Sequence, residues 1–268
     1  MVRRSRLDAE LVRRGLARSR EHAVALIAEG RVAVSGRAAT KAATGVDANT
    51  PVVVRTDHDE PTWVSRGAHK LLGALEAFPV PVEGRRALDA GASTGGFTDV
   101  LLRRGAREVV AVDVGYGELA WSLRTDERLR VLERTNVRTL APDQIGGAVD
   151  LVVADLSFIS LRLVLAALTA CARPDADLLP MVKPQFEVGR ERLGAGGVVR
   201  DPEHRVRAVV EVAEAAATLG WGTAGAVASP LPGPAGNVEF FLWLRRDAAP
   251  TGDAVEEMVR RAVDEGPR

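Results

Sequence analysis

The sequence predicts an α/β protein with a doubly wound, mostly parallel seven-stranded sheet and a small α+β domain before it. Two observations lead to this prediction. From residue 86 onward, short apolar runs alternate with segments of helical periodicity, which is typical of a parallel sheet covered by helices. Before residue 60, two short helical patterns are followed by alternating residues around a Ser-Gly turn. A chain of 268 residues has room for one large domain and one small domain.

The first domain, expected over residues 1–60, begins with two helices. Leu7 and Leu11 fall at helical spacing in the first of them. The second is expected to start at a Ser19 cap and to end at Gly30. The stretch RVAVSGRAA then alternates around its turn, so a hairpin is expected to follow.

Residues 61–65 form the expected linker, because this region is polar and contains a proline. The second domain, expected over residues 66–268, starts with a helix in SRGAHKLLGALEAF. Ser65 is the expected cap of this helix, and Lys70 lies within it.

The elements of the sheet follow from the alternation of apolar runs and helical patterns. Strands are expected at residues 86–90, 108–113, 129–133, 150–155 and 177–183. Helices are expected between them at about residues 96–104, 117–124 and 160–172. A further helix has Asp201 as its cap and Pro202 at its first position, and it ends before Gly220. The runs WGTAGAVAS and NVEFFLWLRR then form an antiparallel closing pair, and DAVEEMVRRAV a last helix.

Composition and charge narrow the classes of function. The net charge is zero, yet residues 1–41 carry ten basic and four acidic residues, which indicates a polyanionic partner for this end of the chain. A solvated basic face is the alternative. The single cysteine, Cys171, allows no internal disulfide and no Cys-rich zinc site, and the four histidines lack metal-ligand spacing, so no metal is expected. No signal peptide or membrane-spanning run is recognisable, so we expect a cytoplasmic protein with no membrane partner.

A glycine-rich turn is expected between the strand at 86–90 and the helix that follows it. In RALDAGASTGGFTDVLL the glycines are Gly91, Gly95 and Gly96, at a place where the backbone can approach a ligand and a helix presents free N–H groups. Their spacing differs from GxGxxG, which disfavours a nicotinamide dinucleotide. The expected cofactor-binding residues of this turn are Asp89, Gly91, Ser93, Thr94, Gly95, Gly96 and Phe97. Asp89 in particular could pair with the ammonium group of an amino-acid-containing cofactor.

The expected cofactor site also includes two residues, Asp113 and Asn136, that come at or after the ends of the next two strands. Asp113 lies 17 residues beyond Gly96, where a carboxylate can accept both hydroxyl protons of an adenosine ribose. Asn136 could reach an adenine edge. The alternative for both is an ordinary turn residue.

Two amines and two carboxylates fall where the sheet could gather them at one edge. Asp155 and Lys183 each end an apolar strand, at the carboxyl edge where open sheets bind ligands. Glu239 interrupts an otherwise apolar strand, and Lys70 completes the set. The chain has 33 arginines and three lysines, two of which belong to this set. Arginine stays protonated, whereas a partly buried lysine can accept a proton. The alternative is that both lysines are structural members of ion pairs.

The N-terminal segment resembles a known RNA-binding domain. The stretch RLDAELVRRGLARSREHAVALIAEGRVAVSGR is similar to the αL-type domain of a small-subunit ribosomal protein, of pseudouridine synthases and of tyrosyl-tRNA synthetases. This resemblance implies binding to structured RNA through its shape and its phosphates. The expected RNA-binding residues are Arg3, Arg4, Arg6, Arg18, Arg20 and, near the linker, Arg66.

The second domain resembles a family of methyltransferases. The stretch LDAGASTGGFT resembles the first motif of S-adenosylmethionine-dependent methyltransferases, and Lys70, Asp155, Lys183 and Glu239 match in order the Lys-Asp-Lys-Glu tetrad of FtsJ-type ribose 2'-O-methyltransferases. Together with VSRGAHKL, VVADLSFISL, VKPQFEVG and PLPGPAGNVEFFLWLR, these motifs make the chain resemble the TlyA family of rRNA (cytidine-2'-O)-methyltransferases over nearly its whole length.

The resemblance implies methyl transfer from S-adenosylmethionine to a ribose 2'-hydroxyl of cytidine in 16S and 23S rRNA, within the 30S and 50S ribosomal subunits. Lys183, orientated by Asp155 and Glu239, is then expected to accept the hydroxyl proton, while Lys70 stabilises negative charge. Mycobacterial members carry Arg-Ala-Trp-Val in the linker, where this chain has PTWV at 61–64, so the linker arginine is absent.

Three other hypotheses about function are alternatives to an rRNA methyltransferase. A non-catalytic RNA-binding protein could use the second domain as a scaffold, although the intact glycine turn and tetrad argue against it. A membrane-active haemolysin, a label attached to this family, lacks support from a cationic amphipathic helix. A dehydrogenase is disfavoured by the glycine spacing.

Overall fold

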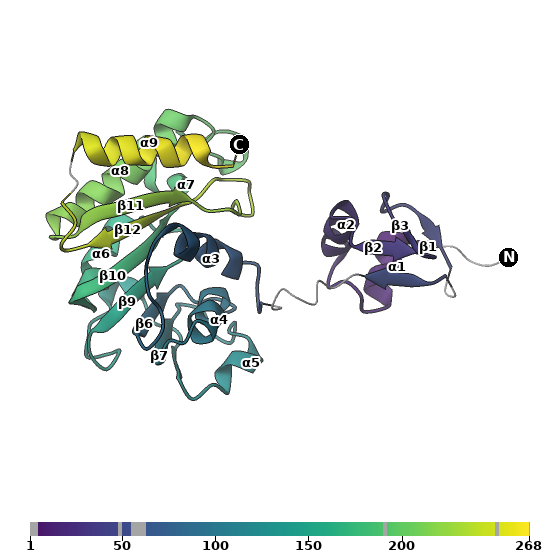
Figure 1. Ribbon diagram of the computed structural model, residues 1–268, viewed down its shortest axis with the longest axis horizontal. Helices are drawn as coiled ribbons and strands as arrows, with labels where there is room; N and C mark the ends of the chain where they lie inside the picture. Colours follow the sequence, from purple (N-terminus) through teal and green to yellow (C-terminus); the bar gives the residue numbers. More distant parts are fainter. Residues whose placement is uncertain (1–4, 48–49, 55–62, 190–191, 250–251, 268) are drawn as a thin grey trace. The chain divides into compact units, whose positions relative to one another are not determined.

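A computed structural model describes residues 5–47, 50–54, 63–189, 192–249 and 252–267. The chain divides into two compact units, Met1–Thr62 and Trp63–Arg268 (Figure 1). Arg3 and Arg4 and the first two residues of the expected linker lie outside the described residues. Trp63 and the two residues after it belong to the second unit.

The first unit packs two short helices against small antiparallel sheets. Its helices are α1 (Leu7–Arg13) and α2 (Arg20–Ala28). Its strands are β1 (Ser5–Arg6), β2 (Val32–Val34), β3 (Arg37–Ala38), β4 (Gly45–Val46) and β5 (Val52–Val54), in the sheets β1-β4 and β3-β2-β5. The Ser19 hydroxyl accepts from the His22 backbone N–H at 3.1 Å, as expected of a cap. Leu7, Leu11 and Ile27 form the centre of an apolar core.

The second unit confirms the predicted seven-stranded, mostly parallel sheet, with the order β11-β12-β10-β9-β6-β7-β8. Its strands are β6 (Arg86–Ala90), β7 (Glu108–Val112), β8 (Leu129–Leu132), β9 (Val149–Ala154), β10 (Ala172–Val182), β11 (Gly222–Ala228) and β12 (Phe240–Arg245). Strand β12 runs antiparallel to both of its neighbours, and the pairs among β6 to β10 are parallel.

Helices cover both faces of this sheet. They are α3 (Ala68–Ala77), α4 (Gly96–Arg103), α5 (Trp121–Arg124), α6 (Leu165–Ala170), α7 (Pro184–Glu187), α8 (Pro202–Thr218) and α9 (Asp253–Glu265), with short 3-10 turns η1 (Val137–Thr139), η2 (Leu161–Leu163) and η4 (Ala195–Gly197). Helix α9 lies beside α8 and β11 (Figure 1). Successive residues of one strand enter different cores: Leu88 packs on the α6, α8 and α9 side, whereas Ala87 packs on the α3 and α4 side. This explains why the strands read as continuous apolar runs.

Three expected helices differ from the observed ones. Ser65 does not cap α3: the cap position is Gly67, and the Ser65 hydroxyl lies against Gly96 instead. The helix expected at 117–124 is shortened to α5, because Gly117 adopts a left-handed backbone with φ +75°. The helix expected at 160–172 is divided into η2 and α6, and β10 begins at its last residue.

Candidate active site

The carboxyl edge of the sheet places the predicted polar residues near one another. The paired strand ends Ala90, Val112 and Ala154 are in register, so the residues after them emerge along one edge. Lys183 follows β10 at the same edge. Strand β12 is antiparallel, so its first residues lie there too, and Glu239 precedes it directly. The apolar pattern around Glu239 predicted the strand correctly. Glu239 was expected inside this strand, but it lies directly before the first residue, Phe240.

Lys70, Asp155, Lys183 and Glu239 form one chain of alternating charges. Lys70 Nζ lies 2.6 Å from Glu239 Oε2 and 4.0 Å from Asp155 Oδ2. Lys183 Nζ lies 2.6 Å from Asp155 Oδ1. The side chains of Lys70, Lys183 and Glu239 are 10%, 8% and 1% exposed, so each charge needs the opposite charge beside it. Glu239 contacts Lys70, whereas it was expected to orientate Lys183.

Ser157 joins this cluster and was missed in the sequence. Lys183 Nζ donates a hydrogen bond to the Ser157 hydroxyl at 2.9 Å. Ser157 lies two residues after Asp155, on the loop that leaves β9. Its position in that loop was the available signal, because residues just past a strand at this edge commonly reach a ligand site.

The glycine turn between β6 and α4 is shaped by close contacts. A Cβ on Gly91, which has φ +87°, would lie 2.6 Å from the Asp155 backbone oxygen. A Cβ on Gly96 would lie 2.4 Å from the Ser65 hydroxyl. Gly95, with φ +96°, faces Leu123 rather than a cavity. Only glycine fits Gly91 and Gly95 without strain, and Gly91 brings the turn against the tetrad residue Asp155.

Two cavities meet at this turn. The larger, of about 510 Å³, is lined by Gly91, Ser93, Asp113, Val114, Glu118, Thr135, Asn136, Val137, Asp155, Leu156, Ser157, Phe158, Ile159 and Val164. The smaller, of about 300 Å³, is lined by Ser65, Arg66, Gly67, Lys70, Gly91, Ala92, Ser93, Thr94, Gly96, Phe97, Asp155, Ser157, Lys183 and Pro234. Gly91, Ser93, Asp155 and Ser157 belong to both linings. A molecule in the larger cavity would therefore lie next to the two lysines.

Asp113 and Asn136 line the larger cavity and also hold the backbone. The Asp113 carboxylate accepts from the backbone N–H groups of Ser93 at 2.8 Å and Gly115 at 2.7 Å. The Asn136 side-chain oxygen accepts from the Arg138 backbone N–H at 3.0 Å. Both residues thus act in turns, which was the alternative reading, while their side chains remain part of the cavity wall.

Asp89 is fully buried beneath the turn and lines neither of these cavities. Its Oδ2 accepts a hydrogen bond from the Thr98 hydroxyl at 2.6 Å. Its Oδ1 has no hydrogen-bond partner in the described part of the chain. Burial raises the pKa of this carboxyl to about 7, against the lowering effect of the Thr98 hydrogen bond. The structure therefore does not bring this predicted residue to the cavity surface.

The expected RNA-binding arginines that the structure describes are exposed. Asp8, which is buried, accepts from Arg6 at 3.1 Å and from Arg20 at 2.9 Å, so it holds two exposed guanidinium groups together. Hydrogen bonds from these arginines keep the pKa of Asp8 well below its usual range. Arg18 is exposed, and Arg66, also exposed, lines the smaller cavity of the second unit.

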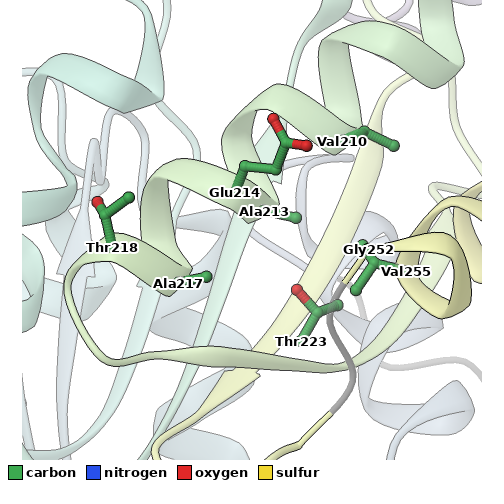
Figure 2. Close-up of a pocket in the computed structure, with 8 residues that line it drawn as sticks. All are labelled: Val210, Ala213, Glu214, Ala217, Thr218, Thr223, Gly252 and Val255. Carbon is green, nitrogen blue, oxygen red and sulfur yellow. The ribbon is translucent and has the colours of Figure 1, made fainter.

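A third cavity, of about 360 Å³, lies away from these residues. Figure 2 shows its lining side chains on α8, on β11 and at the start of α9: Val210, Ala213, Glu214, Ala217, Thr218, Thr223, Gly252 and Val255. It shares no lining residue with the two cavities at the glycine turn. In the described part of the chain, no helix is both long and apolar enough to cross a membrane.

Comparisons with known proteins agree with this geometry. Residues 63–246 match the FtsJ-like methyltransferase family, and residues 5–52 match the S4 domain. The 16S/23S rRNA (cytidine-2'-O)-methyltransferase TlyA of Mycobacterium tuberculosis is 63% identical over 269 residues, covering 100% of both chains. YqxC of Bacillus subtilis, described as a proposed rRNA methyltransferase, is 41% identical and covers 98% of this chain and 94% of its own.

A solved structure also matches both units. It is described as a proposed hemolysin from Streptococcus thermophilus, is 36% identical with a TM-score of 0.74, and covers 99% of this chain and 98% of its own. The family match spans the tetrad and the glycine turn, and the S4 match lies within the first unit and includes Arg6, Arg18 and Arg20. The chain therefore belongs to the FtsJ-like methyltransferase family, in the branch of TlyA rRNA methyltransferases that carries an N-terminal S4 domain.

Proposed function

We propose that this enzyme transfers a methyl group from S-adenosylmethionine to the ribose 2'-hydroxyl of cytidine in 16S and 23S rRNA, acting in the cytoplasm on 30S and 50S ribosomal subunits. The observation that carries the proposal is the pair of cavities at the glycine turn. The larger cavity is lined by the Asp113 carboxylate and by Gly91, which suits a nucleoside. The smaller cavity is lined by both lysines of the tetrad. Gly91 and Asp155 belong to both linings, so a donor bound in the larger cavity would lie beside an acceptor bound in the smaller one.

The size and the lining residues of the larger cavity support S-adenosylmethionine as its ligand. Its volume lies within the range of ordinary cofactor sites. The Gly91 backbone lines it at a place where any side chain would collide with the Asp155 carbonyl oxygen. Asp113 offers a carboxylate to ribose hydroxyls, and Asn136 an amide to an adenine edge. When bound, the cofactor supplies a methyl group carried on a positively charged sulfur.

The contacts of the two lysines support different roles. Lys70 lies between two carboxylates, with Glu239 Oε2 at 2.6 Å and Asp155 Oδ2 at 4.0 Å from its Nζ. We assign Lys70 to stabilising negative charge as it develops on the ribose oxygen. Lys183 has one carboxylate and a hydroxyl beside it, and we assign its neutral amine form, which has released a proton to solvent, to accepting the 2'-hydroxyl proton at Nζ and so becoming an ammonium. An arginine could not accept that proton, because it stays protonated in proteins.

The S4 unit supports the assignment of a structured RNA as substrate. Arg6 and Arg20 converge on one buried carboxylate and leave both guanidinium groups exposed. Such a fork suits phosphate oxygens, and the binding should weaken steeply with salt.

The test is methylation of purified 30S and 50S subunits, with the modified nucleotides mapped in 16S and 23S rRNA. We expect cytidine 2'-O-methylation by the native enzyme and none by Lys183→Arg, which keeps the charge but loses the proton acceptor. Thermal unfolding should show that the variant is folded. Full activity of Lys183→Arg would contradict the proton-acceptor role, and methylation of only one subunit would restrict the substrate to that subunit.

A further inference from the structure

We infer that Ser157 is a positioning residue, which orientates the Lys183 amine toward the substrate hydroxyl. The inference rests on the proposed function and adds a residue that lies outside the tetrad and to which the resemblance assigns no role. It starts from a difference between the two contacts of the Lys183 nitrogen. Asp155 Oδ1 lies 2.6 Å away, yet this oxygen has no hydrogen-bond partner within the residues described. Ser157 Oγ lies 2.9 Å away and accepts a hydrogen bond.

These contacts constrain the amine in different ways. A charge contact depends mainly on distance and only weakly on direction, so the contact with Asp155 chiefly holds the nitrogen in place. A hydrogen bond prefers a nearly straight N–H···O angle, so Ser157 fixes where one N–H bond points. A neutral amine has a single lone pair, and that lone pair must face the hydroxyl to take its proton. The direction of the lone pair therefore depends on Ser157.

The local fold holds Ser157 against Lys183. Phe158 follows Ser157 with a left-handed backbone at φ +63°, and its ring lies 5.3 Å from the ring of Phe186. Phe186 belongs to α7, which begins directly after Lys183. Two adjacent contacts, Ser157 with Lys183 and Phe158 with Phe186, thus join the loop after β9 to the end of β10. A bulky residue with positive φ is strained, and such strain is retained where the surroundings require one conformation.

Both cavities give access to this contact. Ser157 lines the larger and the smaller cavity, and Lys183 lines the smaller one. The Ser157 residue is exposed, whereas the Lys183 side chain is 8% exposed. Replacing Ser157 should therefore leave folding intact, and an effect on catalysis would come from the amine rather than from the core.

The experiment compares Ser157→Ala and Ser157→Thr with the native enzyme on ribosomal subunits. Loss of the hydrogen bond that orientates the Lys183 amine should lower kcat up to about tenfold in Ser157→Ala. The KM for the subunit should stay within about twofold, because the direction of the amine matters to proton transfer rather than to RNA binding. Ser157→Thr keeps the hydroxyl and should restore kcat. Ser122→Ala, an exposed serine of α5, is the matched control.

A second measurement needs no methylation. The chain contains three lysines, Lys41, Lys70 and Lys183, so NMR of protein labelled with ¹³C at lysine Cε gives three assignable signals. We expect Ser157→Ala to move the Lys183 signal alone. Unchanged kcat, an unchanged Lys183 signal, or no restoration by threonine would each overturn the role of Ser157. A native enzyme that methylates no ribosomal RNA would overturn the proposed function instead, and the NMR result would then still decide whether the contact exists.

Discussion

Replacing Asp89 by asparagine should make the stability of the second unit less dependent on pH. Asp89 is 0% exposed, and burial raises its pKa from an ordinary value near 3.8 to about 7. The Thr98 hydrogen bond opposes this rise, whereas the nearby charges of Asp155 and Asp113 add to it. The folded protein therefore favours the neutral acid, and ionisation of this group costs stability.

The sign and the size of this pH dependence follow from the linkage between proton binding and folding. Between pH 4 and pH 7 the unfolded chain has lost the Asp89 proton while the folded chain retains it, so stability falls as the pH rises through this window and is constant above it. At 1.36 kcal/mol for each pH unit, a pKa change from 3.8 to about 7 corresponds to about 4 kcal/mol. Asparagine does not ionise. The free energy of unfolding of Asp89→Asn, minus that of the native protein, should therefore increase by up to about 4 kcal/mol from pH 4 to pH 8.

This difference in the free energy of unfolding can be measured by urea unfolding monitored through tryptophan fluorescence, which reports on the second unit. The four tryptophans, Trp63, Trp121, Trp221 and Trp243, all belong to the second unit. The control is Asp175→Asn, because the Asp175 side chain is 81% exposed. Its effect should stay within about 0.5 kcal/mol at every pH. A difference between Asp89→Asn and the native protein that does not change with pH would refute the reasoning from burial.

The remaining predictions concern the glycine turn and the RNA contact. Gly91→Ala combines a left-handed backbone with a collision 2.6 Å from a carbonyl oxygen, so it should lower the free energy of unfolding by about 3 kcal/mol and weaken cofactor binding measured by calorimetry. Gly84→Ala has φ +72° but open space around the new Cβ, and it should cost about 1 kcal/mol without changing cofactor affinity. Arg20→Gln should weaken binding to ribosomal RNA severalfold and reduce the slope of log affinity against log salt by about one. An unchanged slope, or an equal loss in the control Arg260→Gln on α9, would count against Arg20 as a phosphate contact.

Much of the fold is a local property of the sequence and could be predicted from it. The apolar runs of the strands, the cap at Ser19 and the proline after Asp201 each act within a few residues. The edge of the sheet was predictable as well, because parallel strands place the residues that follow them on one side. Asp155 and Lys183 lie there for this reason.

Where local signals failed, a tertiary contact had replaced them. Ser65 reads as a helix cap, yet its hydroxyl lies against Gly96 from another helix. Asp89 reads as a ligand to a cofactor ammonium, yet it is covered completely, because the turn above it packs closely on the strand ends. Both differences depend on neighbours that the nearby sequence does not specify.

The sequence by itself determined which residue types the candidate active site contains, that lysine rather than arginine stands at two positions, and that a strand, a glycine turn and a helix hold them. Only the tertiary structure decided the partners: Lys70 with Glu239, 169 residues away, and Lys183 with Ser157 and Asp155. The physical reason is that the two kinds of interaction join residues at different separations along the chain. Strand and helix periodicity arise from the backbone of neighbouring residues, whereas an ion pair forms only where the packing of the whole sheet brings two side chains within a few ångströms of each other.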